Sequence, residues 1–266
     1  ALKEGARVEK NLEKRNATDF ALWKFSPKDQ ARQMEWESPW GIGFPGWHIE
    51  CSAMSMMHLK DHLDIHCGGI DHIDVHHTNE IAQSEAATGH DFFKFWMHGA
   101  FLNITGGKKM AKSEGNFLTL ANTFIDKNIS PLVYRFASFQ THYRKPMEYS
   151  DATIESAING YRHLKNQVRT IAQAAGDEKS EVDQGFREQF MGAINDDLNM
   201  PRAMAVIQEL LKSDLPDARK YATVLDFDRI TGLELDKVLE KESLPPEVQE
   251  RVDARIKARE DKNWAL

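Results

Sequence analysis

Three side chains in the first third of the chain have the types and spacing of metal ligands. His76 and Glu80 are four residues apart, so in a helix both project from one face. Cys51 falls about one turn into an expected helix, where the positive end of the helix dipole favours a thiolate. A thiolate, an imidazole and a carboxylate that converge are ligands for tetrahedral zinc. Three such ligands with one free position would mark a catalytic zinc ion.

Other interpretations of these residues stay open on sequence grounds. His72 lies four residues before His76 and competes as a ligand on the same face. Cys67, beside two glycines, is a second candidate thiolate, although a plain turn residue is the simpler interpretation. A cysteine on a helix is more commonly a small buried hydrophobe, and histidines on a polar face are commonly just solvated.

A second chemical feature is a glycine-rich loop that carries three lysines, Gly106 to Asn116. Lysines in such a loop do not belong to a core. They suit a mobile arm that brings ammonium groups to a polyphosphate and stabilises the charge that develops in the transition state. The alternative is an ordinary exposed charged loop. The loop is not a Walker P-loop, because the G-x-x-x-x-G-K-[ST] spacing is absent.

The first half of the chain alternates between strand-like and helix-like segments. This alternation predicts a parallel α/β sheet, in which ligands collect at the carboxyl ends of the strands. Gly89 is the expected helix terminator, and Gly99 interrupts the last strand. The expected elements are a strand at 19–25, a loop at 39–46, a helix at 47–62, a strand at 63–66 ended by a turn at 67–69, a helix at 73–88 and a strand at 92–104.

The second half has helical periodicity throughout. Pro131 follows Ser130 as the first residue of one helix, and Ser150 caps a long helix that runs to about Ala175. Further helices are expected at 182–196, 201–212, 217–231 and 246–265. The fold class is therefore α/β plus all-α, with a helical bundle appended to an α/β half.

Composition bounds the class of protein. The chain has 266 residues, 34 basic against 41 acidic side chains (net −7) and 41% hydrophobic residues, which excludes a disordered chain. No stretch is long and apolar enough to span a membrane. The two cysteines suit a reducing cytoplasm rather than a disulfide scaffold. The acidic balance argues against a general nucleic-acid coat protein, although a local basic patch would still hold one defined RNA.

Five motifs in a fixed order closely resemble the class I cysteinyl-tRNA synthetases. The resemblance also includes Asp19 to Phe25 and Asn195 to Asn199, and it covers nearly the whole chain. The motifs are P-G-W-H-I-E-C-S-A-M (45–54), D-I-H-C-G-G-I-D (64–71), H-H-T-N-E-I-A-Q-S-E-A (76–86), W-M-H-G (96–99) and K-M-A-K-S-E-G-N (109–116).

The resemblance implies an organisation and an activity. Residues 1–117 would be part of a Rossmann-like catalytic domain, 118–150 a junction that contacts the tRNA stem, and 151–266 a tRNA-binding helical bundle. The enzyme would activate L-cysteine with ATP and Mg2+ to cysteinyl-adenylate and transfer the cysteine to tRNA(Cys). It would act as a cytoplasmic monomer, with no membrane partner.

The resemblance also assigns roles to individual residues. Cys51, His76 and Glu80 would bind one zinc ion per chain, which contacts the substrate thiol, and His72 then drops out as a ligand. Trp47 would line the amino-acid pocket, although a packing role is nearly as good an interpretation. Lys109 and Lys112 would be catalytic, contacting the triphosphate. The ATP-binding set would be Gly68, Gly69, Asp71, His98, Lys109, Met110 and Lys112.

The chain departs from the family pattern in three places, one of which is its carboxyl end, which stops just after Trp264 where the family continues into a small domain that reads the anticodon. Ala111 stands where the lysine loop usually has serine, and we expect this to be tolerated because the lysines do the electrostatic work. The family's further zinc cysteine and its His-x-Gly-His signature are absent from Ala1 to Leu266. We therefore expect full activity from an intact parent protein and incomplete activity from these residues alone.

Two alternative functions accompany this interpretation. One is a related ligase that joins cysteine to an amino sugar in thiol biosynthesis, and the other is a non-catalytic zinc- or RNA-binding module derived from a synthetase. Asn79 to Gln83 and the long helical half favour the synthetase, because a small-molecule ligase has no tRNA to hold. Basic residues of the long helix, Arg162, Lys165 and Arg169 among them, would as a group bind phosphates.

Overall fold

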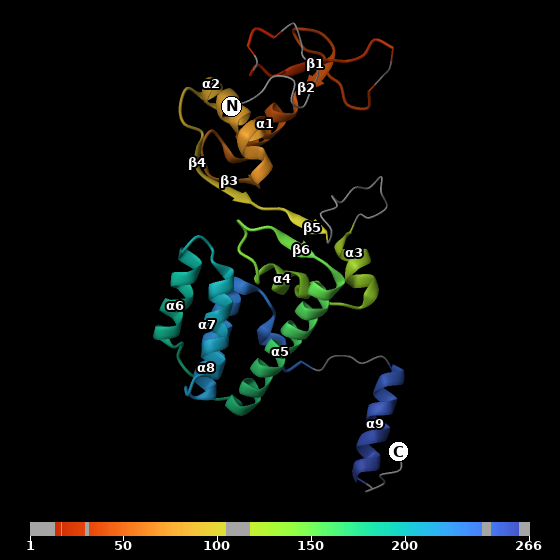
Figure 1. Ribbon diagram of the computed structural model, residues 1–266, viewed down its shortest axis with the longest axis vertical. Helices are drawn as coiled ribbons and strands as arrows, with labels where there is room; N and C mark the ends of the chain where they lie inside the picture. The colour runs from red at the N-terminus through yellow and green to blue at the C-terminus, as the bar shows by residue number, and fades with distance from the viewer. Residues whose placement is uncertain (1–13, 17, 30–31, 105–117, 241–245, 261–266) are drawn as a thin grey trace. The chain divides into compact units, whose positions relative to one another are not determined.

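The computed structural model describes residues 14–16, 18–29, 32–104, 118–240 and 246–260. The chain divides into two compact units (Figure 1). Unit 1 comprises Ala1–Phe117 and Tyr143–Tyr149, and unit 2 comprises Leu118–His142 and Ser150–Leu266. Unit 1 holds all the strands of the described residues, whereas the described part of unit 2 is helical.

Unit 1 begins with a short antiparallel pair of strands. Strand β1 (Trp23–Phe25) pairs with β2 (Gly43–Pro45), and Trp23 lies opposite Pro45. The strand expected from residue 19 begins only at Trp23. Asp19 instead closes a turn, because its carboxylate accepts hydrogen bonds from the backbone N–H groups of Arg15 and Asn16. A local side-chain bond has here outcompeted strand pairing.

Helix α1 (Trp47–Leu59) leads into a strand–helix–strand unit. Strand β3 (Leu63–Gly69) pairs in parallel with β4 (Phe93–Gly99), which confirms the predicted parallel arrangement. The expected turn at residues 67–69 is wrong, because Cys67, Gly68 and Gly69 continue β3 and pair with the last residues of β4. The connection runs through η1 (Ile70–His72), η2 (Ile73–His77) and α2 (Thr78–Thr88).

The segment before α2 departs from the regular helix expected from residue 73. η2 is a π-helix, a widened turn that is rare and is frequent at functional sites. Two consecutive histidines at its end, His76 and His77, are both buried, at 3% and 4% exposure. Gly89 ends α2 in the left-handed conformation, with φ 80°, as its position predicts.

The expected strand at 92–104 is two strands. β4 ends at Gly99, and β5 (Leu102–Ile104) pairs in parallel with β6 (Met147–Tyr149). The interruption at Gly99 is confirmed. Strand β6 was not expected, because three residues carry too little alternation to be told from a loop.

The described part of unit 2 follows the predicted helices closely. Ser150 begins α5 with a capping box, its side chain accepting a hydrogen bond from the N–H of Thr153. The helix expected to reach residue 265 is described to Glu260, and the rest of it lies outside the described residues. The helices are α3 (Leu120–Thr123), η4 (Ile125–Lys127), α4 (Leu132–Ser138), α5 (Asp151–Ala175), α6 (Gln184–Asn195), α7 (Met200–Lys212), α8 (Asp217–Thr231), η5 (Leu235–Lys237) and α9 (Pro246–Glu260).

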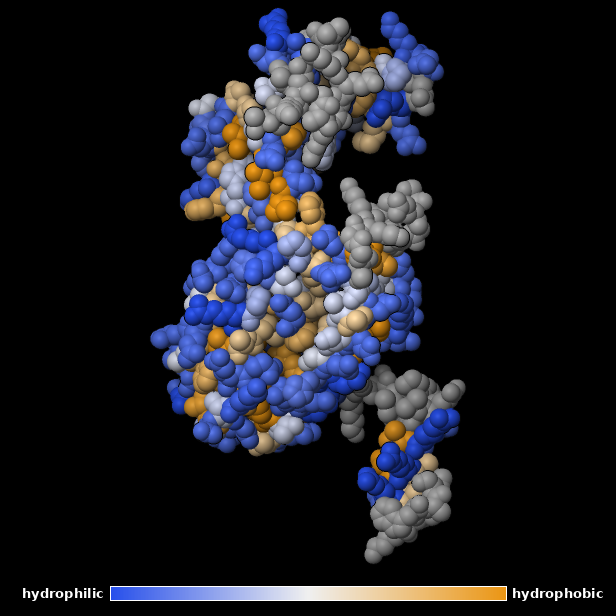
Figure 2. All heavy atoms as spheres, viewed as in Figure 1, coloured by the Kyte–Doolittle hydropathy of each residue, from blue (hydrophilic) through white to orange (hydrophobic). Residues whose placement is uncertain are grey.

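An apolar core joins α5, α6, α7 and α8. Phe190 of α6 stacks on Phe227 of α8 with ring centroids 4.1 Å apart, and both are almost fully buried. Hydrophilic residues predominate on the face of unit 2 that Figure 2 shows. Among the described helices, we find none with the length and apolar character that a membrane span requires.

The segment after α8 is tied back to the helices by buried and half-buried polar groups. Both carboxylate oxygens of Asp228 accept hydrogen bonds from the chain that follows, including the N–H groups of Leu233 and Leu235. The hydroxyl of Tyr161 donates to the carbonyl of Leu233 at 2.6 Å. Arg169, expected to face tRNA, uses its Nε to bond the carbonyl of Val238 at 2.7 Å.

Candidate metal centre

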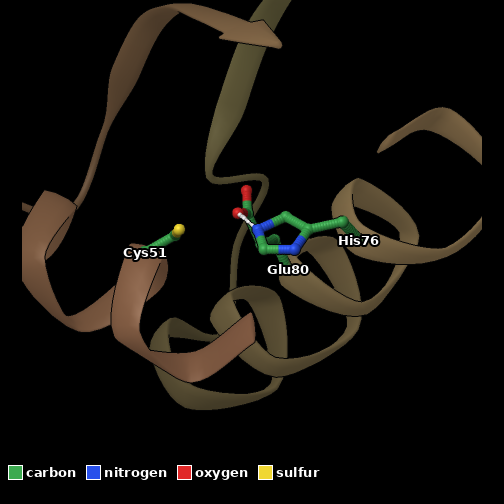
Figure 3. Close-up of side chains that lie close together, drawn as sticks. All are labelled: Cys51, His76 and Glu80. Carbon is green, nitrogen blue, oxygen red and sulfur yellow. Dashed lines mark ion pairs between the residues drawn. The ribbon is translucent and has the colours of Figure 1, made fainter. Parts of the chain in front are cut away.

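Three neighbouring elements bring the predicted ligands together. Cys51 lies on α1, His76 at the end of η2 and Glu80 in the first turn of α2. One ligand atom from each of the three lies within 4.8 Å of the others. In Figure 3 the sulfur of Cys51 and the ring of His76 point toward the Glu80 carboxylate. The structure therefore brings a soft sulfur, a ring nitrogen and a carboxylate oxygen to one point.

The Glu80 carboxylate is the centre of this cluster and is 1% exposed. Its Oε2 lies 2.5 Å from Nε2 of His66 in a hydrogen bond. Its Oε1 faces Nε2 of His76 at 2.6 Å, within ion-pair distance. Burial opposes the charged form, yet His66 and the other histidines outweigh it and lower the pKa of Glu80. A buried carboxylate whose two oxygens face ring nitrogens, with a cysteine sulfur close by, fits a cation site.

The ring of His76 is oriented by a contact at the nitrogen that does not face Glu80. Its Nδ1 lies 3.0 Å from Nδ1 of His48, so one of the two nitrogens donates a hydrogen bond. This contact leaves Nε2 facing Glu80. The ring of Trp47 contacts His76 edge-on, with centroids 4.4 Å apart. An imidazole held through one nitrogen so that the other is presented to a cation is the usual arrangement of a metal-binding histidine.

Cys51 does not begin as a thiolate. Burial, followed by the charge of Glu80, raises the pKa of its thiol to about 11. The expectation that the helix dipole favours a thiolate is therefore wrong for the metal-free protein, because desolvation and a nearby carboxylate are stronger effects here. A bound divalent cation reverses that balance, since a coordinating thiol loses its proton.

A second group of ligand atoms shares Glu80. Atoms of His66, His77 and Glu80 also lie within 4.8 Å of one another. Burial lowers the pKa of His77 to about 4, and its Nδ1 lies 2.8 Å from Nε2 of His98. The first group suits zinc better, because it offers a sulfur ligand, whereas the second offers only nitrogen and oxygen.

The structure also gives positions for the other predicted site residues that it describes. Gly68 and Gly69 end β3 opposite His98 and Gly99, and a Cβ on Gly68 would lie 2.4 Å from the ring of His77. Asp71 and His72 follow in η1, and His72 stacks on His76 without belonging to either group of ligand atoms. Trp47 is 57% exposed. Lys109, Met110 and Lys112 lie outside the described residues.

Two supporting histidines, His48 and His66, were not predicted from the sequence. Both lie inside quoted motifs, but neither has ligand spacing to His76 or Glu80. A signal existed for His66, because in a strand it shares a face with Gly68, the residue in contact with His77. That signal could be used only if the strand was predicted to continue to residue 69, and the sequence analysis ended it at residue 66.

Comparison with known proteins identifies the family. The family model described as "tRNA synthetases class I (C) catalytic domain" matches residues 1–159. Two similar proteins are named cysteine--tRNA ligase. The chain belongs to the class I cysteinyl-tRNA synthetase family.

These two relatives are bacterial. "Cysteine--tRNA ligase 1" of Burkholderia lata is 45% identical over 256 residues, which are 95% of this chain and 53% of the relative. "Cysteine--tRNA ligase" of Treponema denticola is 39% identical over 295 residues, covering 100% of this chain and 60% of the relative. This member of the cysteinyl-tRNA synthetase family thus spans between half and two thirds of the length of these relatives.

A solved structure has a similar fold. It is a ternary complex of a leucyl-tRNA synthetase of Agrobacterium radiobacter K84 with tRNA and LeuAMS, at TM-score 0.50 and 14% identity. The match covers 79% of this chain and 35% of that one. It supports the class I synthetase fold expected for this cysteinyl-tRNA synthetase family member.

Proposed function

We propose that this chain is the zinc-binding and tRNA-contacting part of a cysteine--tRNA ligase. The whole protein activates L-cysteine with ATP and Mg2+ and transfers the cysteine to tRNA(Cys). The observation that carries the proposal is the convergence of ligand atoms of Cys51, His76 and Glu80 within 4.8 Å of one another, in a chain of this family. Those three residues hold one zinc ion, with a coordination position left for the substrate.

The ligand set accounts for selection of cysteine over serine. A pocket that relies on apolar fit separates side chains differing by one small group by only about 1–3 kcal/mol. Zinc, once bound, supplies a soft acid for which sulfur is a far better ligand than a hydroxyl oxygen. The chain's own residues hold the geometry, with His48 orienting His76 and His66 orienting Glu80. Exposed Trp47, against His76, forms a wall of the amino-acid pocket.

The proposed nucleotide site lies at the carboxyl ends of the parallel strands. Gly68 and Gly69 stand at the carboxyl end of β3. Asp71 follows them in the chain, and His98 lies opposite Gly68 on the neighbouring strand. Ligands of open α/β sheets bind at this edge. We assign these residues to ATP, together with Lys109, Met110 and Lys112, which lie outside the described residues. The two lysines stabilise the triphosphate as cysteine's carboxylate attacks the α-phosphate and pyrophosphate leaves.

The remaining assignments concern domains and partners. Residues 1–117 form the catalytic part, 118–150 the junction to the acceptor stem and 151–266 a tRNA-binding bundle. The basic residues of α5 support this role, although Arg169 also has a structural bond to Val238. The enzyme works as a monomer in the cytoplasm, where its two unpaired cysteines remain reduced.

A chimaeric enzyme tests the function. This chain replaces the matching 53% of the Burkholderia lata relative, and cysteine-dependent ATP–pyrophosphate exchange and charging of tRNA(Cys) are measured. We expect both activities, and we expect Cys51→Ser to remove zinc and to abolish discrimination against serine. The unmodified relative and a Cys67→Ser chimaera are the matched controls.

The outcomes separate the competing functions. Exchange without tRNA charging would support the amino-sugar ligase instead. A folded chimaera that binds tRNA but has no exchange activity would support the non-catalytic module. Zinc content is also measured on the 266-residue chain by itself, and metal retained in full by its Cys51→Ser variant would refute the ligand assignment.

A further inference from the structure

We propose that Gln83 is a positioning residue that sets the distance between the two helices carrying the metal ligands. It acts with Ser52 and Ser84 as a buried polar clamp, a name we use for these three residues. The inference rests on the proposed zinc site. It concerns residues that touch none of the three ligand atoms.

The clamp connects α1 to α2 through hydrogen bonds. The Nε2 of Gln83 donates to the backbone carbonyl of His48 and to Oγ of Ser52, both at 2.6 Å. The hydroxyl of Ser84 donates to Oγ of Ser52 at 2.8 Å. Ser52 and Ser84 are 3% and 0% exposed. Each of these bonds crosses from one helix to the other.

The position of the clamp in the two helices matches that of the ligands. Ser52 follows Cys51 directly, and His48 precedes it by one turn. Gln83 and Ser84 lie one turn after Glu80. A shift of α1 along α2 would therefore move the Cys51 sulfur relative to the Glu80 carboxylate, and the clamp resists that shift.

No apolar residue of α1 or α2 is fully buried, so apolar packing constrains this alignment only weakly. Ser52 is the one fully buried residue of α1, and the fully buried residues of α2 are Glu80 and Ser84. The large apolar residues Met54 and Met57 of α1 are 55% and 81% exposed. Apolar contacts tolerate sliding, whereas hydrogen bonds require defined distances and angles. The relative position of the two helices therefore depends on polar contacts.

The amide of Gln83 is not arranged for stability alone. Its Oε1 is buried and has no hydrogen-bond partner among the described residues. An unsatisfied buried acceptor costs about 1–3 kcal/mol. Both short bonds of this side chain go to the turn that carries Cys51. An amide that is kept here at such a cost is consistent with a positioning role.

The test measures metal binding by the full 266-residue chain. Zinc affinity is determined by competition with a chelator, and the visible spectrum of bound Co2+ reports the geometry and the sulfur ligand. The variants are Gln83→Met, which keeps the side-chain volume, and Ser84→Ala, a smaller change. The control is Thr88→Val, because the Thr88 hydroxyl donates to the backbone carbonyls of Ser84 and His90 and, among the described residues, to nothing on α1.

We expect Gln83→Met to weaken zinc binding by about 10- to 100-fold, the effect of losing an outer-shell partner. We expect its Co2+ spectrum to lose intensity in the sulfur charge-transfer band. Ser84→Ala should change affinity and spectrum in the same direction by a smaller factor, and it is decisive if Gln83→Met does not fold. Thr88→Val should match the unmodified chain.

Two results would overturn the inference. In the first, the clamp variants bind zinc as tightly as the unmodified chain and give the same Co2+ spectra. The other is an equal loss in Thr88→Val, which would indicate general weakening of the helix. Failure of the zinc site itself looks different, because then the unmodified chain and Cys51→Ala would bind zinc equally poorly.

Discussion

Replacing Asp228 by asparagine should destabilise the helical unit and leave the metal centre intact. The Oδ1 atom of Asp228 accepts hydrogen bonds from Oγ1 of Thr231 at 2.6 Å and from the N–H of Leu233 at 2.7 Å. Its Oδ2 accepts from the N–H of Leu235 at 2.7 Å. Asparagine keeps one oxygen, so at least one buried N–H group would face an NH2 group.

The size of the effect follows from these three contacts. A hydrogen bond to a charged group contributes about 1.5–3 kcal/mol and a neutral one about 0.5–1.5 kcal/mol. The substitution loses one charged bond outright and converts the others to neutral bonds. Because Leu233 and Leu235 are fully buried, water cannot replace the lost acceptor. We expect the free energy of unfolding of unit 2 to fall by about 2–4 kcal/mol.

Two probes follow the two units separately. Urea unfolding followed by circular dichroism reports mainly the helices of unit 2. Tryptophan fluorescence, measured with Trp264 of unit 2 replaced by phenylalanine in every variant, reports unit 1, because the other five tryptophans lie between Trp23 and Trp96. With a slope of about 2 kcal/mol per molar urea, the circular-dichroism midpoint should fall by about 1–2 M. The fluorescence midpoint and the zinc affinity should not change.

A matched variant controls for the change of charge. Asp226→Asn lies on the same helix but removes only the ion pairs with Arg187 and Arg229, which are worth about 0–1 kcal/mol. If Asp228→Asn shifts the midpoint no more than Asp226→Asn does, the carboxylate does not hold the segment after α8. An equal shift of both probes would also refute the reasoning.

Three further predictions follow. Since burial raises the pKa of Tyr161 to about 12, its ionisation favours the unfolded chain, so unit 2 should lose stability as pH rises from about 10 to 12. Tyr161→Phe, unfolded by urea across that range, should reduce this loss. Zinc should change the fluorescence of Trp47, whose ring contacts His76, and a titration of Trp47→Phe should lack that change. Gly68→Ala should lower the thermal stability of unit 1 by about 1–3 kcal/mol, because its Cβ would overlap the ring of His77. An unchanged melting temperature would contradict this.

Helices with a clear start and a clear apolar stripe could be predicted from the sequence. Ser150 and the buried positions Ile154, Leu164 and Val168 fix both the start and the inner face of α5. Apart from the strand start at residue 19, where a local bond of Asp19 decides, the failures lie where a nonlocal pairing decides. The residues of β6 form a strand because β5 lies beside them, and Cys67 to Gly69 belong to β3 because β4 extends past them. Neither pairing is encoded in local periodicity.

The candidate site, too, was only partly predictable from the sequence. The four-residue spacing of His76 and Glu80 places them on one face, so this pair was predictable from spacing alone. Cys51 was a candidate from its residue type and its place in an expected helix, and the family resemblance then favoured it over Cys67, since no spacing rule links residues 25 positions apart. His48 and His66 support the ligands from other elements. Their roles depend on how α1, β3 and α2 meet, which requires the structure.

The π-helix η2 makes the ligand geometry sensitive to a single residue. Each residue of a regular helix turns the chain by about 100°, so deleting one residue between Ile70 and Val75 would rewind the widened turn as ordinary helix. His76 and Glu80 would keep their spacing, but the approach from β3 would be rotated, and His66 would no longer meet the carboxylate. The length of this segment should therefore be under stronger constraint than the identity of most of its side chains.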